Sequence, residues 1–381
     1  MIINVREASL KLLDWARKRN FEGFDPYDAL NSPLARVLSL GTKHGRIALT
    51  QALRRAPFNF RLALMIKPGA NPKAIALFLE GCVALGEAAT AKTLAERLLS
   101  LRSPGFSGSA WGYNFPWQNR FQLLPRNTPT IVNTAFAGHA LLDYYETSRD
   151  PKTLDAALAT SDFILNDLNR LTNGDNELCF SYTPLDRNFV HNANLLGASL
   201  LARLAVDYER PEALDPALCA LRYSARCQHD DGSWFYAQRH EQNWVDSFHT
   251  GFNLEALRRV LTLGLVPELR ENYEKGVRFY AERFFLQDGT PLYYADKLYL
   301  VDIHAPAEAI CFFASERDYD DLTDRVLRWT FENMYDHKSG VFYFRKKGRR
   351  VIKTPYMRWS EAWAFRALSK YAYSRGDRYA F

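Results

Sequence analysis

The chain has 381 residues, 47% of them hydrophobic and 14% aromatic, so it is long enough to bury a sizeable core. Its net charge of +6 is modest and no long Lys/Arg tract carries it, so we expect no nucleic-acid partner. The five cysteines are scattered, as free thiols in a reducing compartment are, and no secretory leader or membrane-spanning apolar run is apparent. These features predict a soluble, cytoplasmic protein.

Six segments in chain order combine a polar start with an apolar helical run, and they begin near residues 71, 129, 190, 245, 301 and 356. Asn133, Asn192, His249, His304 and Glu361 mark equivalent points of five of them, and successive markers lie 59, 57, 55 and 57 residues apart. The first segment reaches the same point near Lys73 to Ile75. The pattern therefore indicates six copies of one unit.

A second, more charged set of helical segments alternates with the first, beginning with TAKTLAERLLSL. Most of its members are followed by a glycine- and aromatic-containing turn, such as GSAWGYNF, GSWFYAQ, GTPLYYAD and GVFYFRK, which we expect to form short hairpins. Two helices per unit and small, apolar inner helices favour closure into an all-α (α/α)6 toroid. We expect one domain over residues 1–381, with residues 1–60 supplying an N-terminal helical extension and the first outer helix.

In such a ring the starts of the inner helices and the aromatic turns share one face. An Asp before a helix also serves as an N-cap, and a His near an apolar helix is often structural, so each residue alone has a bland explanation. The cluster favours a sugar site, because aromatic rings stack on pyranose C–H faces while polar side chains bind hydroxyls. The candidate catalytic residues are Asp246, His249, Asp302, His304 and Glu361, and the candidate substrate-binding residues are Trp111, Tyr113, Trp117, Asn133, His191, Asn192, Asn194, Trp234, Tyr236, Trp244, Glu308, Arg358 and Trp359.

Two motifs resemble the six-hairpin glycosidase-like toroids. RWSEAWAFRAL (358–368) resembles the last inner helix of unsaturated glucuronyl and rhamnogalacturonyl hydrolases, and WVDSFHTGFNLEAL resembles their Asp-led helix. The resemblance implies that Asp246 stands where that family keeps a catalytic-type Asp. The family's second Asp has no counterpart, because that position reads His191-Asn192-Ala193-Asn194.

Histidines on inner helices, together with an Arg and a Glu, also resemble the N-acylglucosamine 2-epimerase group. That resemblance implies that His249 and His304 exchange a proton beside a ring-opened carbonyl, with Arg358 and Glu361 orienting the substrate. Over its full length the chain is similar in general appearance to the polysaccharide biosynthesis proteins of exopolysaccharide and lipopolysaccharide clusters.

Other chemistries find less support in the sequence. CQHDDGSWFY (227–236) fits the QxxxGxW repeat of triterpene cyclases, but their DxDD acid motif is absent and the segment is better explained as a turn. HExxH, CxxC, Walker A, GxGxxG and GxSxG motifs are also absent, so we expect no metal and no cofactor. RKKGRR (345–350) is either a solvated hairpin tip or a contact for phosphate or an acidic glycan.

The sequence thus predicts a carbohydrate-active enzyme that uses general acid/base catalysis, with a glycoside hydrolase-like activity in bacterial surface polysaccharide metabolism as the first hypothesis. The alternatives are a sugar epimerase, a non-catalytic glycan-binding toroid and, more distantly, a terpenoid cyclase. The expected partner is an oligosaccharide or polysaccharide, possibly acidic, whose charge Arg358 would bind. The identity of the sugar and the oligomeric state stay open.

Overall fold

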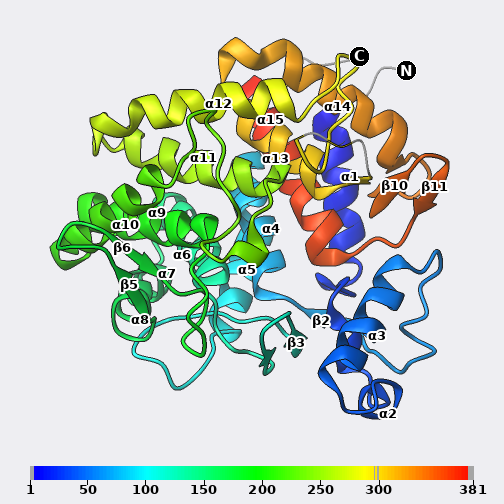
Figure 1. The fold of residues 1–381 in the computed structure, drawn as a ribbon. Coiled ribbons are helices and arrows are strands. Elements are labelled where there is room, and N and C mark those ends of the chain that lie inside the picture. The colour runs from blue at the N-terminus through cyan, green and yellow to red at the C-terminus, as the bar shows by residue number, and fades with distance from the viewer. Residues whose placement is uncertain (1–3, 296, 298–299, 376–381) are drawn as a thin grey trace.

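The computed structural model describes residues 4–295, 297 and 300–375. In this part of the chain six inner helices pack in cyclic order, and the ring closes because the last of them lies against both its predecessor and the first (Figure 1). The inner helices are α4 (Pro72–Leu85), α6 (Ile131–Ser148), α9 (His191–Asp207), α11 (Ser247–Thr262), α13 (His304–Phe313) and α15 (Trp363–Arg375). The predicted (α/α)6 toroid is therefore confirmed.

Small residues on the inner helices let neighbouring helices approach closely. A Cβ added at Gly138 of α6 would lie 2.6 Å from the side chain of Leu200, and one at Gly197 of α9 would lie 2.3 Å from Ile131. Most inner-helix residues are buried, as expected for helices that are covered by neighbours on several sides. The ring centre is therefore a packed core rather than a channel along most of its length.

The outer helices are amphipathic, and each covers an inner helix with its apolar face. Figure 1 shows α12 and α14 along the upper margin of the ring and α1 beside α15. Because α1 packs on α15, the start of the chain covers the last inner helix. The outer helices are α1 (Val5–Arg17), α5 (Ala88–Ser100), α7 (Pro151–Leu158), α8 (Thr160–Asn166), α10 (Leu214–Arg226), α12 (Arg270–Arg283) and α14 (Asp320–Met334).

Short antiparallel strands form most of the remaining regular structure, in the pairs β1–β2, β3–β4, β5–β6 and β8–β9 and the three-stranded order β11–β10–β7. Two of the predicted hairpins are looser than expected, because the segments around Ala237 and Pro291 pair through isolated bridges only. The strands are β1 (Glu22–Gly23), β2 (Gly69–Ala70), β3 (Trp117–Gln118), β4 (Leu123–Leu124), β5 (Arg170–Thr172), β6 (Leu178–Phe180), β7 (Val301–Asp302), β8 (Tyr335–Asp336), β9 (Val341–Phe342), β10 (Arg345–Lys347) and β11 (Arg350–Ile352).

A small lobe at one corner of the ring holds α2 (Ala35–Leu38) and α3 (Lys43–Arg55), at the lower right of Figure 1. It has a core of its own, centred on Ala29, Leu53 and Ile66. The buried guanidinium of Arg61 ties the lobe to the ring, since it donates to Asp28 (2.7 Å) and to the Tyr356 hydroxyl (2.8 Å). Among the described helices none is both long and apolar enough to cross a membrane.

Candidate active site

A cavity of about 230 Å³ lies at the end of the ring where the inner helices begin. The second residue of each of four inner helices lines it, namely Lys73, Val132, Asn192 and Phe248, and the first residue of α13, His304, lines it as well. The backbone N–H groups and the positive dipole ends of these helices therefore point toward one space. This convergence favours a ligand that carries or develops negative charge.

Aromatic residues from the loops after the outer helices form the wall of the cavity. Tyr236 and Trp244 stack with their ring centroids 4.6 Å apart and their planes 12° apart. Parallel and tilted rings of this kind offer apolar faces to the C–H groups of a sugar. The aromatic lining residues outside the inner helices are Tyr27, Tyr113, Phe115, Trp117, Tyr182, Tyr236, Trp244, Tyr293, Tyr294 and Trp359.

Asp246 is both a helix cap and a partner of His249. Its Oδ1 accepts from the backbone N–H of His249 (3.0 Å), which caps α11, while Oδ2 accepts from His249 Nδ1 (2.7 Å) and Trp244 Nε1 (3.0 Å). Because a carboxylate only accepts, Nδ1 carries a proton, and no hydrogen bond to a described residue uses Nε2. One carboxylate therefore fixes the orientation and the tautomer of a cavity imidazole.

His304 is the second imidazole of the cavity. It is only 2% exposed, and neither of its ring nitrogens has a hydrogen-bond partner among the described residues. Burial, and then the charge of Lys73, lowers the pKa of His304 well below its usual value, so the ring is neutral at physiological pH. An unsatisfied buried polar atom costs about 1–3 kcal/mol, so two of them beside a cavity point to a ligand that binds them.

Lys73 brings an amino group into the same cavity. Its Nζ lies over the rings of Phe136 (4.5 Å), Trp363 (5.1 Å) and Phe252 (5.4 Å). Burial, and then the charge of Arg358, lowers the pKa of Lys73 well below its usual range. No hydrogen bond or ion pair to a described residue occupies this amino group, so its N–H donors are available to a bound molecule.

Arg358, the predicted anion-binding residue, already has a carboxylate partner. Its Nε and Nη2 donate to Asp25 at 2.5 and 2.8 Å, and its guanidinium lies 5.0 Å from the rings of Tyr113 and Trp359. This fork-to-carboxylate geometry satisfies both charges inside the protein. Arg358 lines the cavity as part of a neutral pair, so Lys73 is the basic side chain of the cavity whose N–H donors have no partner among the described residues.

Asp302 and Glu361, two candidate catalytic residues, are buried but do not line the cavity. Asp302 accepts from Arg345 Nε (2.6 Å), Trp359 Nε1 (2.7 Å) and the His304 backbone N–H (3.2 Å), so it positions cavity residues from behind. Glu361 accepts from the Phe342 backbone N–H (3.1 Å), and burial raises its pKa well above the usual value. A π-helical turn over Met357–Ala362 brings Arg358 and Trp359 into the cavity instead of Glu361.

The structure divides the candidate binding residues into two groups. Tyr113, Trp117, Asn192, Tyr236, Trp244, Arg358 and Trp359 line the cavity. The others are buried in the ring, where Trp111 and Trp234 donate to the carbonyls of Leu98 and Ser224 and thereby join outer helices to the loops after them. Those outside the cavity are Trp111, Asn133, His191, Asn194, Trp234 and Glu308.

The phase of the helix explains these exclusions. Asn133 follows the cavity residue Val132, and one step along an α-helix turns the side chain by about 100°. His191 precedes Asn192 and instead contacts Ser224 (3.2 Å) and Gln238 (2.9 Å). The repeat aligns the six units only to within one or two residues. It therefore predicts which turn of each helix lies at the cavity but not which side chain faces the ring axis.

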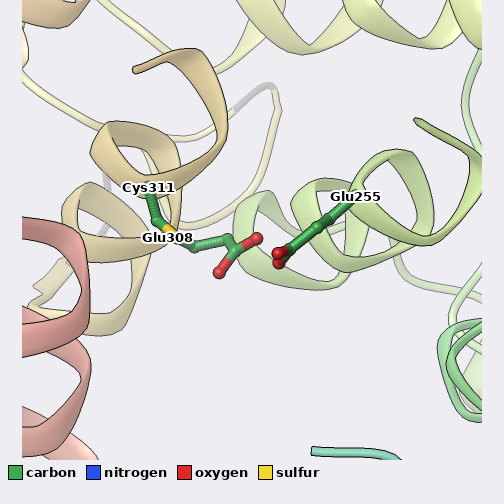
Figure 2. Close-up of side chains that lie close together, drawn as sticks. All are labelled: Glu255, Glu308 and Cys311. Carbon is green, nitrogen blue, oxygen red and sulfur yellow. The ribbon is translucent and has the colours of Figure 1, made fainter. Parts of the chain in front are cut away.

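A second polar cluster lies beneath the cavity. Figure 2 shows the carboxylates of Glu255 and Glu308 pointing toward each other, with Cys311 one turn further along α13. Their ligand atoms lie within 4.8 Å of one another, yet the guanidinium of Arg366 is 3.0 Å from Cys311 Sγ and 2.5 Å from Glu255 Oε1. A cation already fills this cluster, so it is an ion-pair network rather than a metal centre.

Nine residues that line the cavity are not among the candidates predicted from the sequence: Tyr27, Lys73, Phe115, Val132, Tyr182, Phe248, Phe252, Tyr293 and Tyr294. Lys73 lay at the predicted phase of the first unit, and the tyrosines lay in the predicted aromatic turns, so a signal existed for most of them. Tyr27 had none, because it belongs to the N-terminal extension.

No protein-family model matches the chain, and no curated protein matches it by sequence. Solved structures do resemble it. A sugar epimerase from a ruminal bacterium is 13% identical with a TM-score of 0.66, and the match covers 98% of this chain and 99% of that one. A cellobiose 2-epimerase from Bacillus thermoamylovorans is 13% identical with a TM-score of 0.59, over 78% of this chain and 87% of that one.

An α-mannanase from Bacteroides thetaiotaomicron is 11% identical with a TM-score of 0.55, and the match covers 80% of this chain and 86% of that one. At identities this low the likeness concerns the fold. The protein thus has the (α/α)6-toroid fold that is found among sugar epimerases and glycoside hydrolases.

Proposed function

We propose that the protein is a sugar epimerase or aldose–ketose isomerase, which moves a proton at the carbon next to an open-chain carbonyl. The observation that carries the proposal is the presence of two imidazoles with available ring nitrogens in one cavity, His249 through Nε2 and His304 through both nitrogens. A pair of imidazoles is suited to proton transfer near neutral pH in both directions.

His304 fits the role of the base. Its neutral ring accepts the proton from C2, the C–H electron pair moves into a C1–C2 double bond, and the carbonyl oxygen becomes an enediolate oxygen. The amino group of Lys73 and the converging helix N-termini would stabilise that developing charge. The oxyanion would in turn favour the ammonium form of Lys73, which burial by itself disfavours.

His249 fits the role of the proton donor. Return of a proton to C2 from the other imidazole re-forms the C1 carbonyl with inverted configuration at C2. Return of a proton to C1, together with transfer of the O2 hydroxyl proton to O1, gives the ketose instead. For this step His249 starts as an imidazolium, whose Nδ1–H Asp246 accepts and whose charge Asp246 stabilises. It becomes neutral when Nε2 gives its proton to the sugar, while His304 keeps the proton taken from C2 and returns it in the reverse reaction. The aromatic wall would hold the sugar by contact with its C–H faces and limit access of water to the intermediate.

The same geometry supports the first hypothesis, a glycoside hydrolase, less well. Hydrolysis with either stereochemical outcome ordinarily uses two carboxyl groups that flank the glycosidic bond. Among the described residues that line the cavity Asp246 is the only acidic one, and its two oxygens already accept three hydrogen bonds. A terpenoid cyclase is also disfavoured, because Lys73, Asp246 and Arg358 make the cavity polar.

The test is hydrogen exchange at C2. The purified protein is incubated in D2O with a panel of aldoses, ketoses and reducing disaccharides. NMR follows the C2 proton signal of the aldoses and disaccharides and the C1 proton signals of the ketoses. We expect loss of that signal and formation of an epimer or ketose with at least one of the sugars. Cleavage of oligosaccharides without exchange, or tight binding of a sugar that stays unexchanged, would show that the proposal is wrong.

A further inference from the structure

The N-terminal lobe carries a concentration of exposed apolar side chains. Of the 16 large hydrophobic residues that are exposed in the described part of the chain, eight lie between Leu34 and Met65. Leu40 is 84% exposed, Phe58 72% and Leu62 70%. Isolated exposed apolar residues are common on any protein, but a concentration of them in one small lobe marks an interaction surface.

The same segment is basic throughout. Residues 29–70 contain seven Lys or Arg and no Asp or Glu, which exceeds the net charge of +6 for the whole chain. Arg36, Lys43, Arg55 and Lys67 are exposed, and none of the four forms an ion pair with a described residue. The apolar residues therefore stand among positive charges that nothing in the lobe neutralises.

The lobe is an ordered unit that is separate from the core of the ring. Its own core of Ala29, Leu53 and Ile66 buries one side of it, and the hydrogen bond from Arg61 to the Tyr356 hydroxyl (2.8 Å) fixes it to the ring. The exposed apolar residues come from the single turn of α2 with its flanks and from the loop 56–65, where Phe58 and Phe60 pack edge to face at 6.5 Å. They are thus held outward by an ordered scaffold.

We propose that this lobe, residues 29–70, docks reversibly on an anionic lipid bilayer. Phe58, Phe60, Leu62 and Met65 would enter the boundary between headgroups and acyl chains, while the exposed Lys and Arg side chains would face anionic headgroups. Charge complementarity selects this partner, because each basic residue near such a surface contributes favourably and the segment has no acid to oppose it.

The distribution of the apolar residues favours a bilayer over a folded protein partner. They come from one short turn and one loop and alternate with polar and basic residues, so they form no long apolar helix stripe of the kind that fits a partner's groove. A bilayer interface accepts scattered side chains without matching their shape. The lobe also adjoins the cavity, since Arg54 of α3 lies 4.9 Å over the ring of Tyr27.

The test is flotation of the full chain with phosphatidylcholine vesicles that contain or lack phosphatidylglycerol, at low and at high salt. We expect binding to the anionic vesicles that weakens as salt screens the charges. The triple variant Lys43→Glu, Arg55→Glu, Lys67→Glu should lose at least about tenfold in binding. The triple variant Phe58→Ser, Phe60→Ser, Leu62→Ser should lose binding as well.

The matched control is Leu185→Ser, Val206→Ser, Leu286→Ser, which removes exposed apolar residues elsewhere and should bind like the wild type. Thermal unfolding of each variant confirms that the ring is intact. Failure of the wild type to float with anionic vesicles at low salt, or an equal loss in the control, would overturn the proposal. So would a wild-type dimer that the lobe variants convert to a monomer, because a second copy would then cover this face. None of these outcomes depends on the sugar chemistry proposed for the cavity.

Discussion

The toroid contains two buried polar clusters that inner helices supply, one around the cavity and one beneath it. In the lower cluster Arg366 Nε donates to Glu80 at 2.5 Å and Arg366 Nη2 donates to Glu255 at 2.5 Å, while Lys370 reaches Glu255 at 2.9 Å. In the upper cluster His304 and the amino group of Lys73 have no such partner among the described residues.

We infer from this difference that the lower cluster contributes to stability and the upper cluster to chemistry. The lower cluster joins α4, α11 and α15 through the ion pairs of Arg366, which fixes the register of the ring where it closes. The two Glu308 oxygens of this cluster have no hydrogen-bond partner among the described residues, but they do not line the cavity. The upper cluster keeps donors and acceptors free at an accessible cavity. Both clusters hold groups with strongly shifted pKa values, Glu308 below and His304 above, so a shifted pKa alone does not identify a catalytic site.

Replacement of the cavity imidazoles should have the largest effect on activity. We expect His304→Gln and His249→Gln each to lower C2 exchange by about 10²–10⁴-fold, because each removes a general acid/base group. His139→Gln is the matched control, since His139 is also buried on an inner helix but contacts Ser199 (3.2 Å) outside the cavity. NMR exchange rates measured below the unfolding temperature check the prediction, and an unchanged rate in either cavity variant would contradict it.

A substitution in the lower cluster should lower the free energy of unfolding instead of C2 exchange. Arg366→Met leaves Glu80 and Glu255 buried without their main partner, so we expect unfolding free energy to fall by about 3–5 kcal/mol. Arg259→Met is the control, because Arg259 is partly exposed and contributes a single contact to Glu255. Urea unfolding measures both. A stable Arg366→Met protein that has lost C2 exchange would place this arginine in the chemistry and erase the distinction between the clusters.

Glu361 gives a smaller, pH-dependent effect. Its folded pKa is raised, so the native state retains a proton that the unfolded chain loses above about pH 4.5, and stability falls as pH rises from there toward the folded pKa. Glu361→Gln abolishes this loss. We expect the unfolding free energy of the variant to match that of the wild type near pH 4 and to exceed it near pH 8, because only the wild type loses stability over this range.

Thermal unfolding across this pH range tests the effect, with the exposed Glu274→Gln as the control that should show no trend. C2 exchange measured in the same variant separates two roles. Retained exchange supports a buried structural carboxyl behind the cavity, whereas complete loss without any change in stability would restore Glu361 as a catalytic candidate.

The amino-acid sequence alone was sufficient to predict the helical ring and part of the candidate site. The repeat of about 57 residues, with small apolar helices alternating with amphipathic ones, was sufficient because close helix packing and burial impose those residue types. Asp246 and His249 could also be predicted, since a helix cap and the first turn of its helix are neighbours in sequence. The same periodicity placed Lys73 near the predicted phase without revealing its role.

The side chain of each repeat that faces the ring axis could be identified only from the packed structure. A shift of one residue separates Asn133 from Val132, and a π-helical turn separates Glu361 from Trp359. The pairing of Arg358 with Asp25, 333 residues away, also had no local signal, yet it neutralises the predicted anion-binding residue and leaves Lys73 in its place. Helix phase and long-range pairing depend on how the ring closes, so they are set by packing rather than by the repeat.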